Sequence, residues 1–240
     1  MKKIYTVLAL CWAASAALAV VPQPDLLARI HFAGGDTIAA DKNYAPFATQ
    51  FSSPEALALR KQSADRLASW LAHYLNPGAP AGGSQVRPLL EDLQHQEWYL
   101  EAREGNDGKA EWALAIRLSA AQQSAWQTAL QPLLPAATFQ SANGWLVLES
   151  GTGSIKCAPA VLKWLATPAK GWADINLNWP RLAAWFPAIK ELGITQSDLH
   201  VEPVGGNLQV NGELYLANAM TKPLPAWQFP TTLVHQPLGS

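Results

Sequence analysis

The stretch from residue 96 to residue 119, QEWYLEAREGNDGKAEWALAIRLS, predicts a β-hairpin that leads directly into a helix. Apolar and polar side chains alternate in both halves, as in strands that turn one face toward a core. Asn106, Asp107 and Gly108 separate the halves and are typical of a tight turn. We therefore expect this hairpin in the middle of an antiparallel sheet, with four large side chains buried: Trp98, Trp112, Leu114 and Ile116.

The same periodicities place the other elements. Strands are expected at 25–33, 144–150 and 172–179, and in a second hairpin at 199–204 and 208–216. Helices are expected at 52–75, 88–95, 119–133 and 158–166, and after Pro180. Capping boxes are expected for Ser52 with Glu55 and for Ser119 with Gln122. Residues 36–51 and 76–86 show no apolar period and are expected to form loops.

These elements predict an α+β protein, with a mainly antiparallel sheet built from hairpins and helices packed on one face. The order strand, helix, hairpin occurs near both ends of the pattern, which suggests a duplicated unit. Residues 20–217 are expected to form one domain. Residues 218–240 contain four prolines and no period, as in a tail or a linker.

The first 19 residues resemble a cleaved signal peptide, with Lys2 and Lys3 ahead of an apolar run that ends in Ala17-Leu18-Ala19. The run is shorter than a membrane span, so the expected mature protein is exported, periplasmic or extracellular, without a transmembrane anchor. Loss of the two lysines changes the net charge from −1 to −3. That charge, without a basic cluster, argues against nucleic acid as a partner. Cys157 would then be the cysteine left, and it is expected to be a small buried side chain.

Several motifs together resemble a known type of sequence: RIHFAGGDTIAAD, RPLLEDL, EWYLEARE and WALAIRL. They are similar to large uncharacterised exported proteins of the verrucomicrobial and planctomycete kind, over residues 28–240. In that family the chain continues beyond the region of Gln228, Phe229 and Pro230. The resemblance therefore implies that residue 240 truncates a longer architecture, and it brings no activity and no site residues.

Three groups of residues are candidates for a site. His31, Asp36 and Asp41 could form an acid–base group beside the first strand, although aspartates in a polar loop are more often turn residues. Gly151, Gly153 and Lys156 could cradle an anion, or simply form a strand-to-helix loop. Among the eleven tryptophans, three are the better candidates for an interaction surface: Trp164, Trp172 and Trp227.

The five histidines lack metal-ligand spacing and are each expected at or near the surface, so we expect neither metal nor cofactor. Three classes of function remain. The preferred one is a non-catalytic binding or interaction module, whose partner is a protein or the remainder of a longer chain, or which self-associates. The alternatives are an exported enzyme, with glycans as one candidate substrate class, and a carrier of an apolar ligand.

Overall fold

The computed structural model describes most of the chain between residues 25 and 216: 25–45, 48, 52–75, 85–150, 156–166, 171–183, 194–204 and 207–216. The expected signal peptide, the Pro-rich tail and most of the 76–86 loop lie outside these residues. The protein is α+β, with one open antiparallel sheet and helices packed against it, as the sequence predicted, but the helices pack on both faces and not on one.

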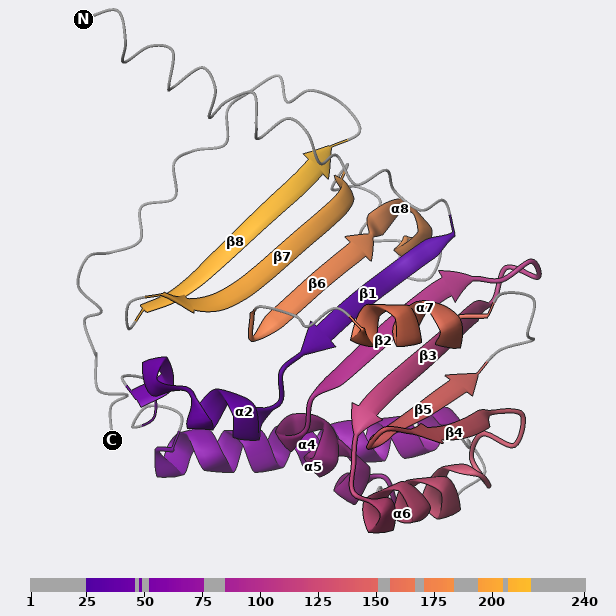
Figure 1. Ribbon diagram of the computed structural model, residues 1–240, viewed down its shortest axis with the longest axis horizontal. Coiled ribbons are helices and arrows are strands. Elements are labelled where there is room, and N and C mark those ends of the chain that lie inside the picture. Colours follow the sequence, from indigo (N-terminus) through magenta and orange to yellow (C-terminus); the bar gives the residue numbers. More distant parts are fainter. Residues whose placement is uncertain are drawn as a thin grey trace, which may run out of the picture.

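Eight strands form the sheet in the order β4-β5-β3-β2-β1-β6-β7-β8, and every neighbouring pair is antiparallel (Figure 1). The strands are β1 (Leu26–Phe32), β2 (Trp98–Glu104), β3 (Ala110–Arg117), β4 (Thr138–Ala142), β5 (Trp145–Ser150), β6 (Ala173–Asn178), β7 (Ile194–Val204) and β8 (Asn207–Leu216). The hairpin β2-β3 lies near the middle of the sheet, which confirms the prediction for residues 96–119.

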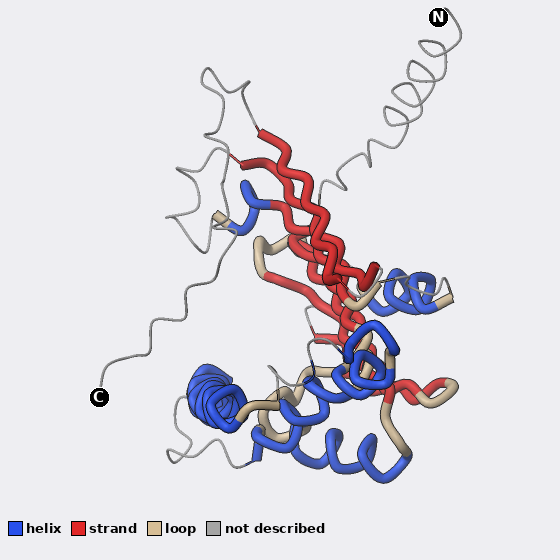
Figure 2. Tube along the Cα trace, turned by 90° about the vertical axis from the view of Figure 1, so that its left-hand side faces the viewer, coloured by secondary structure: helices blue, strands red, loops and turns tan. Residues whose placement is uncertain are grey.

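The helices are α2 (Gly35–Ala40), the 3-10 helix η1 (Lys42–Tyr44), α4 (Pro54–Leu75), α5 (Arg87–His95), α6 (Ala120–Leu130), α7 (Ala158–Leu165) and α8 (Trp179–Leu182). In Figure 2 the sheet is seen nearly edge-on, with α4, α5 and α6 on one side and α7 on the other. None of the described helices combines the length and apolar character needed to cross a membrane.

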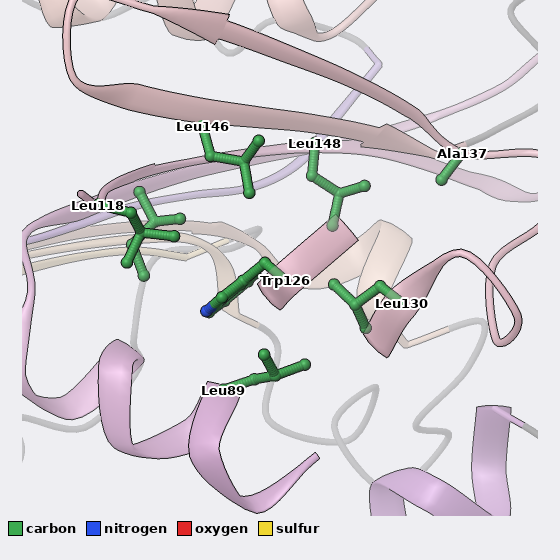
Figure 3. Close-up of a cluster of buried hydrophobic side chains, with 8 residues drawn as sticks. Leu89, Leu118, Trp126, Leu130, Ala137, Leu146 and Leu148 are labelled. Atoms are coloured by element: carbon green, nitrogen blue, oxygen red, sulfur yellow. The ribbon is translucent and has the colours of Figure 1, made fainter. Parts of the chain in front are cut away.

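The main core lies between the sheet and helices α5 and α6. Trp126 of α6 is 2 % exposed and lies between Leu89 of α5 and the leucines of β5 (Figure 3). Its indole nitrogen donates a hydrogen bond to Asp92 Oδ2 at 2.7 Å, so the buried polar atom has a partner. The helix begins with the predicted capping box of Ser119 and Gln122.

Both faces of the central hairpin are covered. On the α6 side, Ile116 is fully buried, and three predicted core residues are half-buried against the same cluster: Trp98, Trp112 and Leu114. On the α7 side, the buried residues are Tyr99, Ala113, Ala115 and Val147, with Cys157 and Val161 packed over them. Cys157 is the small buried residue that was expected, and burial raises the pKa of its thiol to about 12.

The strand order contains a repeat. In the first repeat, β1 is followed by helices and then by the hairpin β2-β3, with β2 paired to β1. In the second, β6 is followed by α8 and then by the hairpin β7-β8, with β7 paired to β6. The two first strands pair with each other, and Ile30 lies opposite Ile175. If the two repeats are exchanged about this pair, the strands β1, β2 and β3 fall on β6, β7 and β8, and their pairings match.

Two features differ from the prediction near the start of the chain. Residues 36–51 were expected to be a loop, but they contain α2 and η1. Helix α4 is capped by Ser53, whose Oγ accepts from the Ala56 amide at 3.2 Å, and not by Ser52. The apolar period of this helix places Leu57, Ala64 and Leu67 on one stripe; Ala64 is buried, together with Ala68, whereas Leu57 and Leu67 are exposed. Small residues face α5 because the two helices pack closely there.

Strand β4 was missed, although its turn has a recognisable sequence. Asn143 and Gly144 join β4 to β5, and both have positive φ, at 50° and 81°. An Asn-Gly pair with this backbone is typical of a two-residue hairpin turn. The strand was missed because its sequence, TFQSA, is mostly polar. That composition suits β4, which lies at an edge of the sheet.

We predict that Ile116→Ala lowers the free energy of unfolding by about 2 to 5 kcal/mol, because it leaves a cavity in the core beneath α6. Leu59→Ala is the matched control on α4, where Leu59 is 64 % exposed, and it should change stability by no more than about 0.5 kcal/mol. Urea unfolding of both variants measures the difference. Equal effects would contradict the assignment of the core.

Candidate functional site: the open half of the sheet

Strands β6, β7 and β8, here called the open half of the sheet, have one polar face and one apolar face. Their side chains alternate in register across the three strands. The polar face lies on the α7 side and carries Asp174, Asn176, Asn178, Gln196, Asp198, His200, Glu202, Gln209, Asn211, Glu213 and Tyr215. The apolar face carries Ile175, Leu177, Leu199, Val201, Leu208, Val210 and Leu214. The three strands contain no lysine or arginine.

A row of alternating acidic and imidazole groups crosses the polar face where the two repeats meet. His31 of β1 lies opposite Asp174 of β6, which lies opposite His200 of β7. The two ring nitrogens of His31 are each 3.4 Å from a carboxylate oxygen, one of Glu97 and one of Asp174. The other oxygen of Asp174 contacts His200 Nδ1, and His200 Nε2 is 3.5 Å from Glu202. Asp174 therefore connects two histidines from different strands.

This arrangement shifts the protonation equilibria of the row. Burial by itself lowers the pKa of His31, but the carboxylates of Asp174 and Glu97 outweigh it and raise the pKa. The contact with Asp174 raises the pKa of His200 despite partial burial. The two histidines in turn lower the pKa of Asp174. The row therefore favours charged imidazoles beside an ionised carboxylate.

A hollow of about 440 Å³ lies beside this row, and it is here called the polar hollow because carboxylates and amides line it together with apolar residues such as Leu26 and Ile175. Trp164 of α7 forms one wall, with the Arg29 guanidinium 5.4 Å from the centre of its ring. Arg29 also pairs with the buried Glu101 at 2.7 Å, which fixes its position. The strands contribute carboxylates and amides to the floor: Asp174, Asn176, Asp198, Asn211 and Glu213.

The opposite face is apolar; its residues on β6 and β7 are half-buried, and those on β8 are open to solvent. On β8, Leu208 is 40 % exposed, Val210 is 54 % exposed and Leu214 is 59 % exposed. This surface continues into an apolar hollow of about 690 Å³, which is lined by residues that include Phe32, Trp98, Trp172, Val201 and Leu208. Among the described strands, β8 ends the sheet, and β7 is its one neighbour. The outer edge and the apolar face of β8 therefore lie together.

The two repeats differ most at their third strands. Exchange of the repeats brings Trp112 of β3 onto Val210 of β8, and Ile116 onto Leu214. Ile116 is covered by α6 and is fully buried, whereas Leu214 is exposed. On the other face the second repeat has become polar, because Asn211 and Glu213 replace Ala113 and Ala115. The open half therefore has one polar face that suits contact with water, whereas its other face is apolar.

The residues proposed as an acid–base group lie in three separate interactions. His31, expected near the surface, is buried and 1 % exposed, because it lies between β2 and β6 and contacts Tyr99 with ring centres 4.5 Å apart. Asp36 pairs with His95 at 2.7 Å. Asp41 accepts from the Trp172 indole at 3.1 Å and from Asn43. Among the described residues, no hydrogen bond or ion pair joins His31 to either aspartate.

The other candidates are only partly described. Lys156 is exposed, whereas Gly151 and Gly153 lie outside the described residues. Trp164 and Trp172 are half-buried and line the polar and the apolar hollow respectively. Trp227 lies outside the described part of the chain.

Asp174, Asp198 and His200 were not predicted as site residues. The strand pattern at 172–179 does place Asp174, Asn176 and Asn178 on one side, and that alternation was the available signal. Nothing local in the sequence shows that His31 lies opposite Asp174, 143 positions later, because the pairing of β1 with β6 brings them together. In the described ranges, no three His, Cys, Asp or Glu side chains form a group suited to a metal ion.

Comparison with known proteins adds no family to this description. No protein-family model matches the chain, and neither the curated proteins nor the solved structures searched contain a match. The chemistry of the open half must therefore be inferred from its own geometry.

We predict that Asp174→Asn lowers the pKa values of both His31 and His200, which can be followed by NMR titration of the imidazole protons. A histidine whose pKa is raised in the folded state stabilises the fold at pH values below 6.5, its pKa in the unfolded state. This contribution is lost as the pH rises through the pKa of the folded state. The thermal midpoint of the wild type should therefore fall as the pH rises above 6.5, and it should fall less in the variant. Asp174, whose pKa is lowered, adds stability above its unfolded value of 3.8 that is lost as the pH falls through its folded value.

Asp198→Asn is the control for this titration. Asp198 lies on the same face but accepts from Asn176 and Gln196, and it pairs with neither histidine. It should leave both imidazole pKa values close to those of the wild type. If Asp174→Asn also leaves them unchanged, the row does not act as described.

Proposed function

We propose that this protein is a non-catalytic interaction module that binds another polypeptide through the apolar face of the open half. The observation that carries the proposal is the exposure of Leu208, Val210 and Leu214 on a strand at the end of the sheet. Exposed apolar side chains are common singly, but a contiguous group on a strand edge is typical of a binding surface. An exported location, expected from the first 19 residues, belongs to the same proposal.

The comparison between the repeats supports the apolar face as the contact. At the equivalent position in the first repeat, Ile116 is covered by α6, and β3 is paired on its outer side with β5. The second repeat keeps apolar residues where that cover would lie. Burial of these side chains is favourable at about 25 cal/mol per Å² of apolar surface, so a polypeptide that covers them gains a direct driving force.

The polar face suits solvent better than it suits the same partner. Its side chains already satisfy one another, since Tyr215 donates to Glu213 at 2.6 Å and Gln196 donates to Asp198 at 3.0 Å. Three strands with four carboxylates and no lysine or arginine also keep this face hydrated. Contact through the apolar face leaves these groups in water.

A second candidate function is acid–base chemistry on a glycan in the polar hollow. The observation that favours it is the meeting of Asp174, His200 and the indole of Trp164 around one hollow. Carboxylates beside an aromatic wall are common at sugar-binding sites. Release of nitrophenol from p-nitrophenyl glycosides by the wild type, and its loss in Asp174→Asn, would support this candidate in place of the interaction module.

The apolar hollow also allows a carrier function. Its volume of about 690 Å³ is within the range of small-molecule sites, and Trp98 and Trp172 line it. It opens onto the same face as Val210 and Leu214, so an apolar side chain of a partner could enter it as readily as a free ligand. Dye binding separates these two occupants, because a free ligand depends on Trp172 and a partner polypeptide depends on Val210 and Leu214.

We predict that a hydrophobic dye binds the folded protein, and that the double variant Val210→Thr with Leu214→Thr removes most of the dye fluorescence. Threonine keeps the strand propensity and removes apolar surface, so folding should be unaffected. Leu59→Thr with Leu67→Thr is the control, because both leucines are exposed on α4 and neither lines the apolar hollow. Dye binding that is lost in Trp172→Phe and kept in the β8 variant would instead indicate a carrier, and a protein that binds no dye would contradict the proposed surface.

A further inference from the structure

The outer edge of β8 is self-complementary. An antiparallel pair of β8 strands from two copies, centred on Gly212, places Val210 of each copy opposite Leu214 of the other. On the polar face it places Asn211 opposite Glu213, so each carboxylate meets an amide. Opposite residues point to the same face in an antiparallel pair, and the apolar faces of the two copies therefore become continuous.

Residues that commonly protect an edge strand are missing from β8, whose sequence is NLQVNGELYL. It has no proline, no lysine and one acidic residue, Glu213, which points to the polar face. The ladder with β7 is ten residues long. A long edge with apolar side chains and no such protection is a template for another strand.

The first repeat shows which kind of strand pairs with such an edge. There the outer edge of β3 pairs with the antiparallel strand β5, with Leu114 opposite Leu148 and Ile116 opposite Leu146. The equivalent positions on β8 are Gly212 and Leu214. A second β8 strand would occupy the place of β5 and bring an apolar residue opposite Leu214, as β5 does opposite Ile116.

On this basis, which rests on the proposed interaction surface, we propose that the partner is a second copy of this chain, joined by antiparallel pairing of two β8 strands about Gly212. The two sheets form one continuous sheet with two-fold symmetry. Leu214 of each copy packs against Val210 of the other, and the acidic polar faces remain in solvent.

Sedimentation velocity of the full chain at micromolar concentration tests the pairing. The wild type should sediment with twice the mass of one chain, and Leu214→Asp should sediment as a monomer, because the substitution places a charge opposite Val210 of the second copy. Leu59→Asp, on α4 at 64 % exposure, is the matched control and should remain a dimer. Circular dichroism confirms that each variant is folded.

Gly212→Cys tests the register without weakening the fold. A side-chain carbon at this position would meet Leu199 Cδ1 at 3.5 Å, an ordinary contact, so cysteine fits. Directly opposite residues of antiparallel strands have Cα atoms about 4.5 to 5.5 Å apart, within the range of a disulfide. Mild oxidation should therefore link two chains through residue 212, whereas Ser124→Cys, exposed on α6, should not link them.

A wild type that stays monomeric, or a dimer that persists in Leu214→Asp and does not cross-link through Gly212→Cys, would overturn the pairing. The proposed function fails separately. If the chain is monomeric but dye binding still depends on Val210 and Leu214, the surface stands and its partner is a different polypeptide. If no dye binds either, both proposals fall.

Discussion

The antiparallel pairing of β1 with β6 joins the two repeats, and the arrangement of the whole sheet depends on it. Ile30 and Ile175 meet at its centre on one face, while on the other face His31 meets Asp174. The pairing also brings Glu97, which precedes β2, into one row with three strand residues, His31, Asp174 and His200. Because this row is charged and partly buried, each carboxylate needs its imidazole, which couples the register of β6 to that of β1.

From this shared centre the two repeats differ in how they are covered. The first repeat buries both faces, under α6 on one side and under α7 on the other, and β5 pairs with its outer strand. The second repeat solvates one face with carboxylates and amides and leaves the other face apolar. The inference of an interaction surface follows from that difference, because the apolar residues of β8 occupy places that are buried in the first repeat.

The sequence predicted the elements with a strong period and missed what depends on pairing between distant strands. The alternation at 96–119, the capping box at Ser119 and the second hairpin all have local causes and were confirmed. The burial of His31 has no local cause in the sequence. A histidine between Ile30 and Phe32 is expected at the surface unless the pairing of β1 with β6 is known. Likewise, Leu57 and Leu67 fit the helical stripe of α4, but the buried line follows Ala64 and Ala68, because the approach of α5 selects small residues.

The central claim is that the outer edge of β8, which ends the described part of the sheet, is covered by a partner strand. Amide hydrogen exchange at two protein concentrations tests it most directly, because exchange reports the protection of each strand separately. The account predicts that the amides of β8 exchange quickly at low concentration and slowly at high concentration, while those of β3 are protected equally at both. Protection of β8 equal to that of β3 at the lowest concentration would show that its edge is already covered, and would contradict the account.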